Sequence, residues 1–216
     1  MINFENIKVA FADKSDKDLS RAYLLFKTIS NPIISNTLTA FIKVAMWLHL
    51  PISWAIKATV YKHFCGGTTI ENSQATIDKL WESNIGTILD FSAEGKENEE
   101  DFNLAMNETI ASIQKAKSES SIPFSVFKPT GLARFALLEK ISSKLKLTKE
   151  EEIEKNTFEG RIENICRIAS ENKVPLFIDA EESWIQNEID DIAIAMMQKF
   201  NKKEAWIFNT LQLYRN

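Results

Sequence analysis

Residues 174–184 read VPLFIDAEESW, and this stretch decides the fold. Its apolar run VPLFI shows no alternation of polar and apolar residues, which is typical of a strand buried on both faces of a parallel sheet. Three carboxylates follow the run directly: Asp179, Glu181 and Glu182. The carboxyl ends of parallel strands are where α/β proteins place their active sites. The stretch therefore predicts a buried strand that leads into a functional site.

Apolar runs and helical patterns alternate over the rest of residues 85–216. We expect strands at 85–91, 123–128, 174–179 and 205–209, with helices at 98–117, 132–145, 149–172 and 185–199. Repeated βα units require a parallel sheet with right-handed crossovers. The sequence therefore predicts an α/β fold with about four βα units in residues 85–216.

Residues 1–84 have helical spacing of apolar residues instead. We expect helices at 16–28, 37–49, 52–64 and 69–84. Ser15 is a suitable N-cap for the first of these helices, and Cys65-Gly66-Gly67 interrupts the pattern before the last. The expected division is a helical region, 1–84, followed by the βα region, 85–216.

Each expected strand leads into polar residues at its carboxyl end. These are Asp90 and Glu94 after the first strand, Lys128 and Thr130 after the second, Asp179 with Glu181 and Glu182 after the third, and Gln212 and Tyr214 after the fourth. First-turn acids such as Glu99 are explained by the helix dipole. Lys128 is not, because a lysine at the end of a buried strand needs an anionic partner or ligand.

Composition excludes several classes of function. The net charge of −4 argues against a broad phosphate-binding surface and thus against nucleic acid as a partner. Cys65 and Cys166 have no metal-ligand spacing, and we expect both to be reduced thiols. The N-terminus lacks the pattern of a secretory signal or an Arg-rich transit peptide. Charged residues interrupt the apolar segment 33–60, so a cytoplasmic protein is expected.

Five segments together resemble the proline dehydrogenase family, whose members are flavoenzymes with a (βα)8 TIM-barrel fold. The segments are FCGG (64–67), ILDFSAEG (88–95), FKPTGLARF (127–135), IDAEES (178–183) and NTLQLYR (209–215). They occur in the family's order and spacing across essentially the whole chain. The closer likeness is to single-function bacterial enzymes of the family.

The resemblance implies oxidation of L-proline to Δ1-pyrroline-5-carboxylate, the first step of proline catabolism, with FAD as cofactor and a quinone as electron acceptor. Lys128 resembles the lysine that pairs with the substrate carboxylate, a role that suits an ammonium group in a dry pocket. Asp179 resembles the acid beside the substrate pocket. Gln212 resembles the glutamine that hydrogen-bonds the flavin ring, since an amide can both donate and accept.

The chain departs from the family in what it lacks. A barrel of this type needs about 250 residues, and the family's later flavin-contacting and arginine-bearing segments are not found here. We therefore expect an incomplete barrel, the N-terminal half of a proline dehydrogenase, which is inactive alone.

Two alternatives come from other classes of protein. The first is a TIM-barrel enzyme that binds Mg²⁺ or Mn²⁺ through Asp179, Glu181 and Glu182, because carboxylate oxygens suit hard cations. The second is a non-enzymatic helical module in residues 33–64 that binds a partner or lies peripherally on a membrane through Trp47 and Trp54.

Overall fold

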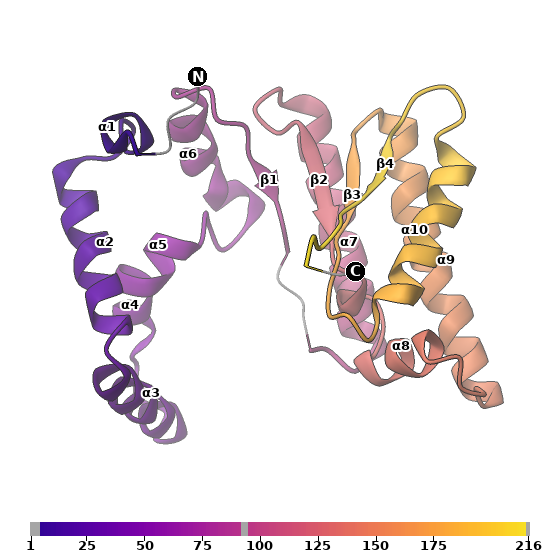
Figure 1. Ribbon diagram of the computed structural model, residues 1–216, viewed down its shortest axis with the longest axis horizontal. Coiled ribbons are helices and arrows are strands. Elements are labelled where there is room, and N and C mark those ends of the chain that lie inside the picture. The colour runs from indigo at the N-terminus through magenta and orange to yellow at the C-terminus, as the bar shows by residue number, and fades with distance from the viewer. Residues whose placement is uncertain (1–4, 92–94, 215–216) are drawn as a thin grey trace. The chain divides into compact units, whose positions relative to one another are not determined.

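The computed structural model describes residues 5–91 and 95–214 of the chain. These divide into two compact units, Met1–Ser83 and Asn84–Asn216 (Figure 1). The first unit is helical. Its elements are α1 (Ile7–Ala10), α2 (Asp16–Ile29), α3 (Pro32–Trp47), α4 (Ser53–Ile56), a π-helix (Lys57–Tyr61), α5 (Lys62–Phe64) and α6 (Ile70–Trp81).

Capping residues explain where the two long helices of the first unit begin. Ser15 caps α2 in a reciprocal capping box with Asp18, which confirms the predicted start. The expected helix at 37–49 begins earlier than predicted, at Pro32. Asn31 caps it by accepting from the backbone N–H of Ile33 and Ile34, at 3.0 and 3.2 Å. Proline suits the first helical position because the N–H that it lacks would have no partner there.

The helix expected at 52–64 is present from Ser53 to Phe64, but its middle part, Lys57–Tyr61, is a π-helix. The π-helix separates α4 from α5, so the side chains that follow it do not continue the helical stripe that precedes it. The helix expected at 69–84 is α6, which Thr69 caps through the backbone N–H of Asn72. Across the described ranges, no helix combines the length and apolar character needed to cross a membrane.

The second unit contains a parallel four-stranded sheet of order β1-β2-β3-β4, as the βα pattern predicted. The strands are β1 (Ile88–Leu89), β2 (Phe124–Phe127), β3 (Leu176–Ile178) and β4 (Ile207–Asn209). All four are shorter than the apolar runs that contain them. Glu94, expected at the sheet edge, lies outside the described residues.

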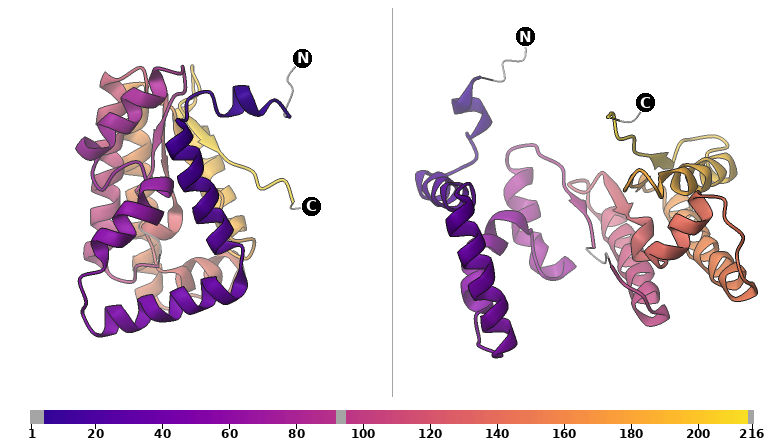
Figure 2. Two further views of the ribbon diagram at one scale, coloured as in Figure 1. Left: turned by 90° about the vertical axis from the view of Figure 1, so that its left-hand side faces the viewer. Right: turned by 60° about the horizontal axis from the view of Figure 1, so that its bottom comes forward.

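Helices connect the strands, and the three long ones, α7, α9 and α10, lie together on one side of the sheet (Figures 1 and 2). They are α7 (Glu99–Ser118), α8 (Phe135–Ser142), α9 (Lys149–Asn172) and α10 (Gln186–Phe200). The bounds of α9 are those predicted, with the expected capping box between Thr148 and Glu151. The helix expected at 132–145 is shorter, because a 3-10 turn, Pro129–Gly131, precedes α8.

The two faces of the sheet differ in burial. Ser125, Leu176 and Ile178, which neighbour one another in register, are fully buried. The alternating residues Phe124 and Phe177 are half-buried and stack with ring centroids 4.6 Å apart. The expectation of strands buried on both faces is therefore wrong for the described residues. An aromatic layer, which Phe208 completes, lines the second face.

Candidate functional site at the carboxyl edge of the sheet

Strand register brings the predicted site residues to one edge. Phe127 of β2 pairs with Ile178 of β3, and Ile178 pairs with Asn209 of β4. The next residue of each strand is Lys128, Asp179 and Thr210, respectively. Because side chains alternate along a strand, this row faces the side of the sheet that carries the aromatic layer.

Two hydrogen bonds hold the carboxylate of Asp179 at the end of β3. Its Oδ1 accepts from the hydroxyl of Thr210 at 2.8 Å and from the backbone N–H of Ala180 at 3.1 Å. Thr210 Oγ1 in turn accepts from Ala180 N at 2.7 Å. Asp179 is half-buried, so these bonds fix its carboxylate relative to β4.

Glu181 joins the loop after β3 to the turn after β2. Its carboxylate accepts from the backbone N–H of Thr130 at 2.9 Å and from the Thr130 hydroxyl. Burial raises the pKa of Glu181, while the bonds from Thr130 and the nearby charge of Lys128 oppose that rise. The side chain is therefore committed to bonds within the protein and lies close to Lys128.

Gln212 lies beside the loop that follows β3. Its Nε2 donates to the carbonyl of Ala180 at 3.4 Å, and its Oε1 accepts from the hydroxyl of Tyr214 at 2.7 Å. Lys128, Asp179 and Gln212 thus follow three adjacent strands. Asp90, also expected at this edge, is exposed after β1.

The arrangement does not support the predicted metal cluster. Asp179 is bonded to Thr210, Glu181 is bonded to Thr130, and Glu182 is exposed. Within residues 5–91 and 95–214, no group of three His, Cys, Asp or Glu side chains could hold a metal ion. The described residues therefore offer the metal-enzyme alternative no group of side chains that could bind the ion.

Two residues of the edge were missed from sequence. Thr210 occupies the same position after β4 that Asp179 occupies after β3, so the strand pattern could have found it. Gln186 is 2% exposed and accepts from the backbone N–H of Glu181 at 2.7 Å. It carries no sequence signal, because a glutamine in the first turn of a helix is usually solvated.

Comparison with known proteins identifies the family. The family model described as "Proline dehydrogenase" matches residues 73–216. The chain is 32% identical over 151 residues to the carbapenem antibiotics biosynthesis protein CarD of Pectobacterium carotovorum subsp. carotovorum, covering 70% of this chain and 40% of that protein. It is 27% identical over 243 residues to the mitochondrial proline dehydrogenase 1 of Dictyostelium discoideum, covering 94% and 42%. The chain spans about two fifths of the length of these relatives.

A solved structure supports the fold. Proline utilization A from Bdellovibrio bacteriovorus, in a crystal structure of the enzyme inactivated by N-propargylglycine, matches 98% of this chain and 23% of its own, with a TM-score of 0.59 and 13% identity. The predicted fold class is confirmed, since the second unit has four parallel strands joined by helices, as in a (βα)8 barrel. By its family model, its relatives and this fold, the chain belongs to the proline dehydrogenase family.

Proposed function

We propose that the carboxyl edge of β2, β3 and β4 is part of an active site that oxidises L-proline to Δ1-pyrroline-5-carboxylate. The observation that carries the proposal is the placement of Lys128 and Asp179 in adjacent positions on the face of the aromatic layer. The ammonium group of Lys128 suits the proline carboxylate, because charge-assisted bonds are strong where water is excluded. Asp179, whose orientation is fixed by Thr210, orients polar groups of the substrate beside it.

Gln212 fits a flavin. Its Nε2 has two hydrogens, and the bond to the carbonyl of Ala180 uses one of them. The other can donate to a ring carbonyl, with Tyr214 fixing the orientation of the amide. In this proposal, bound FAD would supply the redox chemistry, with proline as the hydride donor and a quinone as the electron acceptor. Lys128 and Asp179 bind and orient the substrate.

We also infer that turnover requires strands in addition to β1–β4. A barrel closes with eight strands, whereas β1 and β4 are the two edges of the sheet in the described residues. Residues 1–216 alone, with FAD and L-proline added, are expected to show no proline-dependent bleaching of flavin absorbance. The same chain joined to the remaining strands of a proline dehydrogenase relative is expected to show it.

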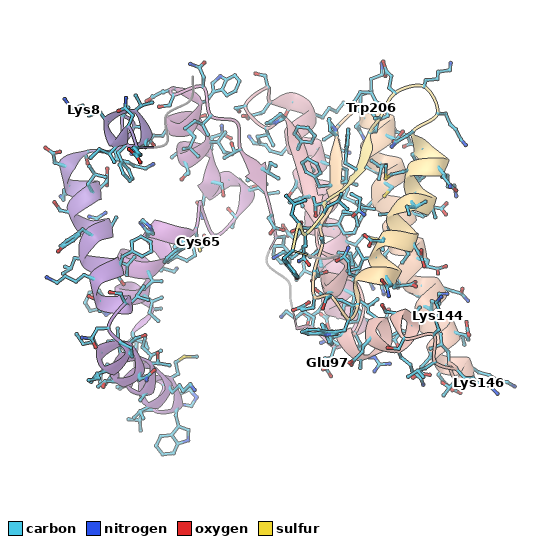
Figure 3. The ribbon with its side chains drawn as sticks, in the orientation of Figure 1. Lys8, Cys65, Glu97, Lys144, Lys146 and Trp206 are labelled. Carbon is cyan, nitrogen blue, oxygen red and sulfur yellow. The ribbon has the colours of Figure 1, made fainter. Side chains whose placement is uncertain are left out.

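The substitution Lys128→Met in the joined protein tests the substrate site. Loss of a bond to a charged group predicts a rise in KM for proline of about 10- to 100-fold. The matched control is Lys146→Met, because Lys146 is an exposed lysine between α8 and α9 (Figure 3). This control is expected to leave KM unchanged. Equal effects of the two substitutions would contradict the role of Lys128. Bleaching by residues 1–216 alone would contradict only the need for further strands.

A second proposal concerns the first unit, which we infer associates with an anionic membrane surface. Residues 19–70 contain Arg21, Lys27, Lys43, Lys57 and Lys62 but no Asp or Glu, in a chain whose net charge is −4. Trp47 and Trp54 are 77% and 73% exposed. Basic segments with exposed tryptophans suit the headgroup region of anionic lipids.

Co-sedimentation with vesicles tests this second proposal. Binding to phosphatidylserine-containing vesicles is expected to exceed binding to phosphatidylcholine vesicles. The substitutions Trp47→Ser and Trp54→Ser are expected to weaken it, and Trp184→Ser, in the second unit, is the control because Trp184 is also exposed. Binding that ignores both lipid charge and the first two tryptophans would rule the proposal out.

A further inference from the structure

A continuous series of hydrogen bonds crosses the carboxyl edge behind the proposed site. The series begins at Thr130, whose N–H donates to Glu181 Oε1 at 2.9 Å. The N–H of Glu181 donates to Gln186 Oε1 at 2.7 Å, and Gln186 Nε2 donates to Asp190 Oδ1 at 2.9 Å. Asn209 Nδ2 donates to the same oxygen of Asp190 at 2.8 Å. These five residues, which we name the edge network, join the ends of β2, β3 and β4.

The edge network is shielded from water. Thr130 is 6% exposed and Gln186 is 2% exposed, and the other three members are half-buried. Buried donors and acceptors that lose a partner cost free energy, because water does not replace it. Gln186 uses both ends of its amide, one for the loop after β3 and the other for α10. The network therefore constrains the loops more strongly than the same bonds would at the surface.

The position of the edge network in the chain relates it to the proposed site. Lys128 stands two residues before Thr130, and Asp179 stands two residues before Glu181. Thr130 belongs to a single 3-10 turn, whose own backbone bonds are few. The bonds to Glu181 are side-chain contacts that tie this turn to the β3 loop.

We propose that Glu181 and Gln186 are positioning residues that hold Lys128 and Asp179 at a fixed separation for the substrate. This inference rests on the proposed function of the edge. Neither residue needs to touch the substrate in this role, because Glu181 is bonded to Thr130 and Gln186 is buried. Displacement of a binding group by about 1 Å is enough to reduce catalysis about a hundredfold, so the edge network determines how well the site works.

Hydrogen exchange on residues 1–216 tests the role of Glu181 and does not require the protein to oxidise proline. Glu181→Ala removes the acceptor of Thr130 and is expected to raise exchange about tenfold in peptides that cover 129–132 and 180–186. Glu181→Gln is expected to restore slow exchange, because its carbonyl accepts from Thr130 N and its amide donates to the Thr130 hydroxyl. Glu182→Ala, one residue away and exposed, is the matched control.

The role of Gln186 has its own pair of variants. Gln186→Leu removes both bonds of the amide and is expected to raise exchange in the peptide that covers 180–186. Gln198→Leu makes the same change at an exposed position of the same helix and is expected to have no effect there. A uniform rise over β2, β3 and α9 would indicate general destabilisation and would overturn the positioning role.

Kinetics of the joined protein separate this inference from the proposed function. Glu181→Ala is expected to raise KM for proline about tenfold, with a smaller change in kcat and with recovery in Glu181→Gln. Normal proline kinetics in Glu181→Ala would overturn the inference and leave the proposed function intact. If the unsubstituted protein does not oxidise proline, the proposed function fails. The exchange measurements then still decide whether Glu181 and Gln186 fix the loops that carry Lys128 and Asp179.

Discussion

The two units of the chain use apolar residues differently. In the first unit, the described residues that are buried include Ala45, Ser73 and Ile77, while the long side chains of α3 are largely exposed. In the second unit, side chains from α7, α8, α9 and the strands form a core in which Phe158 and Leu138 have no exposed surface. Apolar content alone therefore does not show whether a helix contributes to a core. In this chain, the helices that contribute to the large core are those of the unit that contains the sheet.

The largest expected difference between the two units is in the reactivity of their cysteines toward an alkylating reagent. Cys65, in the first unit and labelled in Figure 3, is exposed. Cys166, in α9, is buried. Burial, assisted by the charge of Glu163, raises the pKa of Cys166 to about 12. Relative to a free thiol, this lowers the thiolate fraction at neutral pH about a thousandfold. Mass spectrometry after brief alkylation is expected to find label on Cys65 alone, and labelling of both in urea is the control.

Truncation of a leucine compares the two units directly. Leu138→Ala removes a side chain with no exposed surface and is expected to lower the free energy of unfolding by about 2–5 kcal/mol. Leu38→Ala in α3, where the side chain is 48% exposed, is expected to change it by about 0.5 kcal/mol or less. Urea denaturation measures both. Similar losses at the two sites would mean that α3 is covered in solution, and the contrast between the units would be lost.

Polar contacts within the core of the second unit give a third test. Arg161 is 5% exposed, donates to the carbonyl of Leu132 and to Asn103, each at 3.1 Å, and forms an ion pair with Glu99. Arg161→Met is expected to cost about 3 kcal/mol of unfolding free energy, because these groups lose their partner. Arg167→Met, at an exposed position of the same helix, is the control, with an expected cost of about 0.5 kcal/mol or less. A cost near zero for Arg161→Met would mean that packing alone joins α7 to α9.

A buried carboxyl gives the smallest expected effect. Burial raises the pKa of Glu188, with Lys155 opposing that rise. A carboxyl whose pKa is raised in the folded state contributes stability at acidic pH, where it is protonated. That stability is lost as the pH rises through the folded-state pKa, because the buried group must then ionise. Glu188→Gln is therefore expected to be more stable than the unsubstituted chain at pH ~7, with the gain vanishing below pH ~4. Urea denaturation at both values measures it, and Glu82→Gln, exposed in the first unit, should show no such gain.

Sequence patterns predicted the βα region well because they record burial. The position of α9 follows from its capping box and apolar period, and the parallel sheet follows from repeated βα units. The strands were predicted too long. Apolar residues such as Val174 and Pro175 lie before the point at which β3 begins to pair with its neighbours. Local propensity does not determine where neighbouring strands stop pairing.

The sequence suggested residues of the candidate site only where a polar residue stood next to an apolar run. Lys128 and Asp179 follow apolar runs, so the sequence made them candidates, and register places them at one edge. Gln186 was missed because its partner, the N–H of Glu181, is a backbone group whose position depends on tertiary structure. The joint role of Glu181 and Thr130, which are 51 residues apart, also depends on the pairing of β2 with β3.

The aromatic contacts of the first unit depend on the number of residues in the π-helix as well as on the aromatic side chains themselves. An i→i+5 turn contains one more residue than an α-helical turn, so removing one residue from Lys57–Tyr61 would turn α5 by about 100°. His63 and Phe64, whose ring centroids lie 5.1 and 6.2 Å from that of Phe26, would then point elsewhere. Relatives that lack this one residue should therefore need different side chains at positions 26 and 63 to form an equivalent cluster.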